Sequence, residues 1–147
     1  MCVCNRKFFV RVIAILLTMA LMLPVVASAT TAQPRASAYL DNYNAYVYLP
    51  GNGEVRVYFN VEGTNYMDEL GTLFIEVHES VDGVNWTRVE TYNHYLVPGM
   101  LSYNDDYHSG YVSYDGVVGR YYKAYVCVWG GKNGDGDARY FWTSVKH

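Results

Sequence analysis

The stretch Glu54-Val-Arg-Val-Tyr-Phe-Asn-Val-Glu62 alternates apolar and polar side chains residue by residue. An extended chain points successive side chains to opposite faces, so this period of two predicts a half-buried β-strand. The same period governs the chain from Tyr39 onward, and it indicates an all-β fold. The side chains expected to face the core in this stretch are Val55, Val57, Phe59 and Val61.

Two further stretches repeat the alternation. Residues 73–78 and residues 121–129 each carry an apolar set on every second position. Less regular strands are expected at about 40–49, 86–92, 110–115 and 138–146. The side chains expected to face the core in the two regular stretches are Leu73, Ile75 and Val77, and Tyr122, Ala124, Val126 and Val128.

Turn signals rich in Gly, Pro, Asn and Asp separate these strands. From Tyr39 onward, the only candidate for a helix is one turn at Asn65–Leu70, closed by Gly71. Seven or eight short strands in about 110 residues predict an antiparallel β-sandwich. The turn signals lie at residues 50–53, 82–83, 98–99, 115–116 and 130–136.

The stretch Gly119-Arg-Tyr-Tyr-Lys-Ala-Tyr-Val-Cys-Val-Trp129 resembles the penultimate strand of immunoglobulin-like and fibronectin type III-like sandwiches. In such domains a tyrosine at the start of that strand turns its hydroxyl back to the backbone of the preceding corner. Tyr122 is in phase with the inward residues of the strand and is the expected corner residue, with Tyr121 as the alternative.

Two motifs indicate a broader resemblance. Met67-Asp-Glu-Leu-Gly71, followed by Ile75-Glu-Val-His-Glu-Ser-Val-Asp-Gly-Val-Asn-Trp86, is similar to a family of small secreted proteins of Gram-positive bacteria with no established activity. The resemblance covers most of Tyr39–His147. It implies export and a sandwich fold, and it assigns no site residues.

The N-terminus predicts a secretory signal peptide over residues 1–29. A basic start is followed by the apolar run Val12–Leu23 and then by the small residues Ala27-Ser28-Ala29. As a helix this run would span about 18 Å, well short of the roughly 30 Å hydrocarbon core of a bilayer, which favours a cleaved helical signal over a membrane anchor. Cleavage is expected after Ala29, with Ala38 as second choice. Residues 30–38 are then a flexible lead, and residues 39–147 are the domain.

Removal of the signal changes the charge of the protein. Residues 30–147 keep eight Lys and Arg against 14 Asp and Glu, a net charge of −6, together with all 16 tyrosines. This charge argues against a nucleic-acid partner and against capture by acidic wall polymers or anionic lipid. Cys127 is the only cysteine left, so no intramolecular disulfide is expected, and pairing between chains stays open.

The residues that could carry catalysis form no recognisable signature. Cys127 with His78, His94 or His108 would supply a thiol nucleophile and a base. However, Cys127 lies in the middle of a predicted strand, where a nucleophile is poorly presented, and a structural thiol is the favoured interpretation. A pair of carboxylates for glycoside hydrolysis would need a cleft, which a sandwich this small is not expected to build.

Candidate metal ligands are equally weak. Asp135 and Asp137, in Asn133-Gly-Asp-Gly-Asp137, resemble the start of a calcium loop. The pattern then fails, because Ala138 and Ser144 stand where the turn glycine and the bidentate glutamate belong. The segment Asn104–His108 is expected to be a solvated loop, and neither a metal nor a cofactor is predicted.

Aromatic side chains are the one excess in the composition. If the strand phases are right, several of them face away from the core, and contiguous exposed aromatic residues usually mark a contact surface. The last strand would add Trp142 with Tyr140, or Phe141 in the opposite phase. The binding residues predicted on this sheet face are Phe74, Tyr121, Tyr125, Trp129 and Trp142.

These observations predict a secreted, non-enzymatic binding module that uses the aromatic sheet face to contact a protein. The alternative is a carbohydrate-binding or cell-wall-binding module in which the same rings act as stacking platforms. A small secreted hydrolase is the third hypothesis. A purely structural role for the aromatic rings is also open, because tyrosine suits a pleated surface and cross-strand aromatic pairs stabilise sheets.

Overall fold

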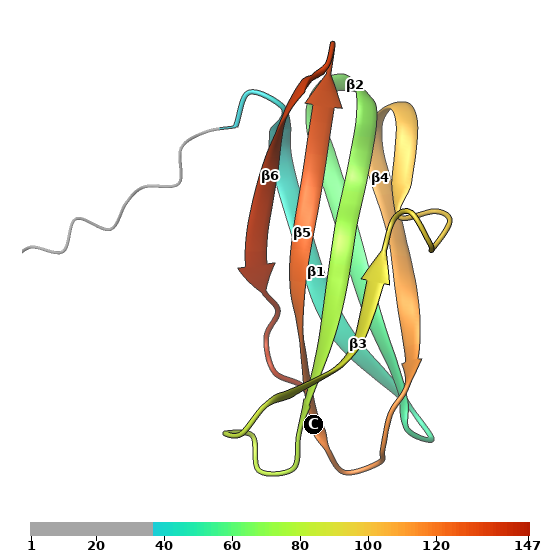
Figure 1. Ribbon diagram of the computed structural model, residues 1–147, viewed down its shortest axis with the longest axis vertical. Helices are drawn as coiled ribbons and strands as arrows, with labels where there is room; N and C mark the ends of the chain where they lie inside the picture. The colour runs from blue at the N-terminus through green and yellow to red at the C-terminus, as the bar shows by residue number, and fades with distance from the viewer. Residues whose placement is uncertain (1–36) are drawn as a thin grey trace, which may run out of the picture. The chain divides into compact units, whose positions relative to one another are not determined.

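The computed structural model describes residues 37–147, so the predicted signal peptide and most of the predicted lead lie outside the described residues. The described part is all-β and antiparallel, as predicted, and contains no helix that could cross a membrane. Its strands are β1 (Leu40–Gly51), β2 (Glu54–Ser80), β3 (Thr87–Asn93), β4 (Leu101–Asp115), β5 (Tyr121–Lys132) and β6 (Asp135–Trp142) (Figure 1).

This part of the chain has six strands instead of the seven or eight expected, because the two strands predicted at residues 54–62 and 73–78 form a single strand. β2 runs without interruption through residues 54–62 and 73–78. Its first half pairs with β1 and β4, and its second half pairs with β3 and β5, while β6 follows β5. The sheet therefore curls into a back layer of β1, β2 and β4 and a front layer of β3, β2, β5 and β6 (Figure 1).

The predicted helical turn at Asn65–Leu70 is wrong, since these residues belong to β2. The apolar pair Met67 and Leu70 has helical spacing, and both side chains are buried. In the structure Met67 pairs with Asp105 and Leu70 with Ser102, after an irregularity in the register between Glu62 and Met67. Pairing with β4 thus overrides the local helical pattern, and the irregularity lets both side chains reach the core.

Gly71 is the residue on which the crossing of β2 between the layers depends. Its φ is +145°, and a Cβ built on it would lie 2.3 Å from the carbonyl oxygen of Met100. The same oxygen accepts a hydrogen bond from the backbone N–H of Thr72 at 2.8 Å. A side chain at position 71 would therefore meet backbone, and only glycine fits there.

The core lies between the two layers and follows the predicted phases. All four predicted inward residues of residues 54–62 are buried, as are Ile75 and Val77. The inward row Tyr122, Ala124, Val126 and Val128 is buried as well. Leu73 is only partly buried. In β6, Phe141 packs against the core, so Tyr140 and Trp142 face outward.

Tyr122 forms the predicted corner contact. Its hydroxyl accepts a hydrogen bond from the backbone N–H of Val117 at 2.7 Å and donates one to Oε2 of Glu79 at 2.6 Å. Arg120 forms an ion pair with the other carboxylate oxygen of Glu79. Burial, followed by the bond to Glu79, raises the pKa of Tyr122 to about 12. The corner between β4 and β5 is thus fastened to the end of β2.

Replacing Gly71 by alanine is expected to lower the free energy of unfolding by about 3 kcal/mol or more, because backbone strain adds to the clash with Met100. Gly134→Ala is the matched control. Gly134 also has a positive φ, +78°, but nothing lies within 4 Å of its added Cβ. It should cost only about 1 kcal/mol. Denaturant unfolding measures both, and equal losses would contradict the role of Gly71.

Candidate binding surface

Four aromatic side chains from three adjacent strands touch one another on the outer side of the front layer. Phe74 comes from β2, Tyr125 from β5, and Tyr140 and Trp142 from β6. The ring centroid of Tyr125 lies 6.1 Å from that of Phe74, 6.3 Å from that of Tyr140 and 4.9 Å from that of Trp142. Phe74 and Tyr140 are also 6.1 Å apart. These four residues are called the front cluster below.

The four rings of the front cluster differ in how much of their surface solvent reaches. Tyr140 is 57% exposed and Trp142 is 47% exposed, whereas Phe74 and Tyr125 are half-buried. Cys127 pairs in register with both Phe74 and Tyr140 and is completely buried. Burial raises the pKa of its thiol, with a smaller opposing effect from the Tyr140 hydroxyl. The rings therefore seal a thiol that the strand alternation directs to the outer face.

Charged side chains continue the surface beyond Trp142. The ammonium group of Lys123 lies 4.3 Å from the ring centroid of Trp86 and 4.4 Å from that of Trp142, a cation–π contact on two sides. The imidazole of His78 lies edge-on to Trp142 at 4.8 Å. Glu76 pairs in register with Tyr125 and forms an ion pair with Arg88 at 2.7 Å, so the surface beside the front cluster carries the ammonium group of Lys123 together with this ion pair.

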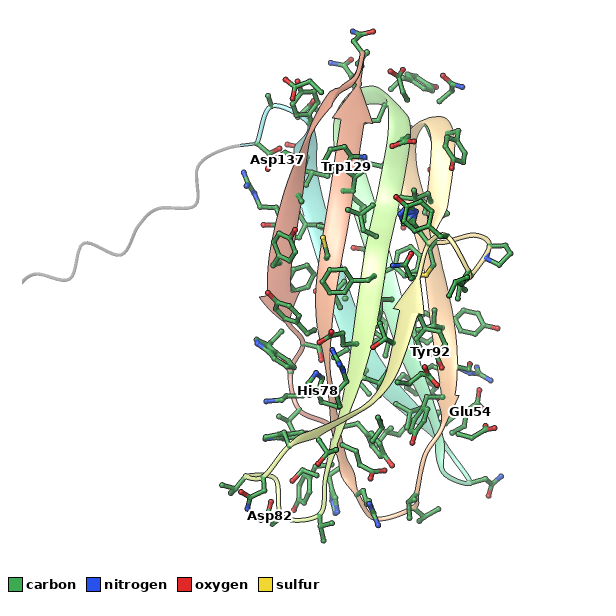
Figure 2. The ribbon with its side chains drawn as sticks, in the orientation of Figure 1. Glu54, His78, Asp82, Tyr92, Trp129 and Asp137 are labelled. Carbon is green, nitrogen blue, oxygen red and sulfur yellow. The ribbon has the colours of Figure 1, made fainter. Side chains whose placement is uncertain are left out.

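The other two predicted binding residues lie away from the cluster. Tyr121 stacks on His147 with ring centroids 4.1 Å apart, at the end of β5 where the strand begins. Trp129 lies toward the opposite end of the front layer from His78, as Figure 2 shows. Its indole N–H donates to Oε2 of Glu69 at 3.3 Å. The structure therefore brings together Phe74, Tyr125 and Trp142, and separates Tyr121 and Trp129 from them.

Trp129 borders a groove that also reaches Phe74. The groove has a volume of about 670 Å³, which is within the usual range for small-ligand sites. It lies where β4 and β5 flank the crossing of β2, beside the loop that follows β3. Its lining residues are Glu69, Leu73, Phe74, Asn93, His94, Tyr95, Leu101, Tyr103 and Trp129.

A second aromatic row lies on the outer side of the back layer and was not predicted. Tyr46, Tyr58 and Tyr111 pair in register across β1, β2 and β4, with neighbouring ring centroids 5.2 Å apart. The planes of Tyr46 and Tyr58 differ by only 11°, so these two rings are stacked, and Tyr46 and Tyr111 are about half exposed, as Trp142 and Tyr140 are. Alternation with Ala45 and Val47 was a usable signal for the β1 member of this row.

The candidate catalytic groups do not converge on one site. Cys127 is sealed beneath the front cluster, and its strand neighbours place Phe74 and Tyr140 beside it. The ring of His78 contacts Trp142, and the ring of His94 contacts Tyr95 at 3.8 Å. His108 lies on β4, where its Nε2 is 2.8 Å from the carbonyl oxygen of Gly99. The proposed thiol and its proposed bases therefore have separate partners.

The candidate metal ligands also have other partners. Asp135 accepts a hydrogen bond from the hydroxyl of Tyr39 at 2.8 Å, and Asp137 forms an ion pair with Arg139 at 2.6 Å. Residues 104–108, expected to be a loop, lie within β4. Over residues 37–147 no group of three or more His, Cys, Asp or Glu side chains is arranged to hold a metal ion.

Comparison with known proteins found no similar protein. Scans against protein-family models, curated proteins and solved structures each found no match to the chain. The candidate site therefore rests on its own geometry.

The seal over Cys127 predicts how fast its thiol reacts. In the native protein, labelling of Cys127 by a maleimide should be slow, because the rings must first move away. Tyr140→Ala should speed it at least about tenfold under native conditions, whereas Tyr111→Ala on the back layer should leave it unchanged. Mass spectrometry of the peptide that contains Cys127 measures the rate. Equal rates in the two variants would show that the front cluster does not cover the thiol.

Proposed function

We propose that the protein is an exported, non-enzymatic binding module that contacts a protein partner through the front cluster. The observation that carries the proposal is the contact among four rings from three strands, with Tyr140 and Trp142 about half exposed. Exposed contiguous aromatic surface is characteristic of contact sites, and Tyr and Trp are enriched among the residues that dominate binding energy at interfaces.

Rigidity supports this role. The base of the cluster is anchored by its contacts over Cys127, and the ring of Trp142 is held between His78 and Lys123. Side chains that are already ordered lose little conformational entropy when a partner docks, so more of the contact energy appears as affinity. The fixed ammonium group of Lys123 would favour a partner with a carboxylate or carbonyl oxygen beside its apolar contact residues.

A purely stabilising role accounts less well for the outer rings. Cross-strand aromatic pairs contribute about 0.2–1 kcal/mol each through contact between the rings themselves. That stabilisation comes from the ring surface of Phe74 and Tyr125 that is in contact with other rings. The surface of Tyr140 and Trp142 that stays exposed to solvent does not contribute to it. The exposed half of the cluster is therefore the part that we assign to the partner.

The proposal includes an immunoglobulin-like or fibronectin type III-like relationship and export of the chain. The first is supported by the corner contact of Tyr122 with Val117 and by the two-layer antiparallel arrangement. The second is supported by the sequence of residues 1–29.

A three-bait experiment tests the protein contact. The unaltered chain, a front variant (Tyr140→Ser with Trp142→Ser) and a matched back variant (Tyr46→Ser with Tyr111→Ser) are immobilised and exposed to secreted and surface proteins of the producing cells. A protein retained by the unaltered chain and the back variant, and at least about tenfold depleted on the front variant, is expected.

Equal retention by all three baits would contradict the proposal, as would the absence of any retained protein. Each bait is first checked for a cooperative thermal transition. If the front variant alone fails to fold, the rings are structural and the proposed contact is wrong.

A further inference from the structure

The indole of Trp129 packs against two glycines of the β5–β6 hairpin. A Cβ built on Gly131 would come within 2.8–3.0 Å of Nε1, Cζ2 and Cε2 of the indole, and a Cβ on Gly136 would lie 2.4 Å from Cζ2 and Cη2. Gly131 and Gly136 are partners in the β5–β6 ladder. The edge of the indole that carries Nε1, Cε2, Cζ2 and Cη2 therefore packs against the hairpin at Gly131 and Gly136, where a larger residue would displace it.

The groove beside Trp129 lies next to the crossing of β2. Gly71 pairs with Leu101 on one side and with Trp129 on the other, so the crossing places these two lining residues on either side of the same point of β2. Glu69, two residues earlier, pairs with Tyr103 and with Gly131. A flat indole, a tyrosine and a carboxylate are thus placed around one depression by backbone pairing.

Polar atoms surround the aromatic walls of this groove. Glu69 holds the indole N–H through its Oε2. The carbonyl oxygen of Asn93 accepts the N–H groups of Leu96 and Val97, and its side-chain oxygen accepts that of Tyr95, which orders the loop carrying Tyr95 and His94. Tyr95 is 84% exposed and Tyr103 is 65% exposed, so the two rings stand open at the rim.

We propose that this groove is a binding site for an uncharged pyranose ring of a glycan, seated on Trp129. The C–H groups on one face of a pyranose form a weakly positive apolar surface that suits the negative face of an indole. The carboxylate of Glu69, the amide of Asn93 and the tyrosine hydroxyls offer the acceptors and donors that sugar hydroxyls need.

Charge selects a neutral sugar over an acidic one. The described residues that line the groove include Glu69 but no Lys or Arg. Residues 30–147 together carry a net charge of −6. A uronate or sulfated sugar in the groove would therefore meet the Glu69 carboxylate, while Lys132 lies in the adjoining depression that Glu69 and Trp129 also line, beside the acidic Asp68 and Asp135. The site goes beyond the proposed protein contact, since Trp129, Glu69, Tyr95 and Tyr103 lie outside the front cluster and only the half-buried Phe74 belongs to both.

Titration of the purified protein with neutral and acidic oligosaccharides tests the site. The probes are hexamers of β-linked glucose, mannose and N-acetylglucosamine, with hexagalacturonate as the acidic control, and affinity is measured by calorimetry. Binding of at least one neutral hexamer is expected. Trp129→Ala should weaken it about tenfold or more, and Trp142→Ala, in the front cluster, should change it less than about twofold.

Two further variants separate geometry from folding. Gly131→Ala keeps Trp129 but displaces its indole, to which the three atoms nearest the added Cβ all belong, so it should weaken sugar binding in a protein that still melts cooperatively. Tyr95→Ala removes an exposed ring at the rim of the groove. It replaces Trp129→Ala as the test for weaker sugar binding if the Trp129 variant does not fold. The proposal is overturned if no neutral hexamer binds at millimolar concentration, if hexagalacturonate binds more tightly, or if Trp142→Ala abolishes binding while Trp129→Ala does not. Failure of the bait experiment would leave this site unaffected.

Discussion

The passage of β2 through both layers is the constraint on which the rest of the structure depends. A strand shared by two layers must turn from one set of partners to another without losing its backbone hydrogen bonds, because buried N–H and C=O groups need partners. Gly71 makes this possible, with a φ of +145° and the carbonyl oxygen of Met100 where a side chain would be. The backbone N–H of Thr72 donates a hydrogen bond to that same oxygen, so the chain keeps a backbone hydrogen bond where it turns.

Both candidate surfaces follow from that passage. The second half of β2 places Phe74 in register with Cys127 and so begins the front cluster. At the crossing, Gly71 pairs with both Leu101 and Trp129, and these two residues line the groove. The first half of β2 instead carries Tyr58 in the back row, where its ring stacks on that of Tyr46. Each layer thus presents a group of aromatic side chains on its outer side.

Regular strands were predictable from the sequence because period-two alternation records which side chains are buried. This holds for Val57, Val77 and Val126, for the corner at Tyr122, and for the outward phase of Phe74 and Tyr125, whereas the phase of the last strand, with Tyr140 and Trp142, stayed open. The crossing was not predictable, because Met67 and Leu70 have helical spacing and only pairing with β4 shows the segment to be a strand. The groove could not be predicted from the sequence either, since it is lined by segments that come together only when β2 pairs with β4.

Native-state hydrogen exchange of the β2 amides tests this account most directly. If β2 is one strand that ties the layers together, the amides paired with β1 and those paired with β5 should exchange through the same opening reaction, with equal free energies close to that of global unfolding. Gly71→Ala should lower both by the same amount. Independent opening of residues 54–63, with a clearly lower free energy than residues 74–79, would contradict the claim that one continuous strand supports both surfaces.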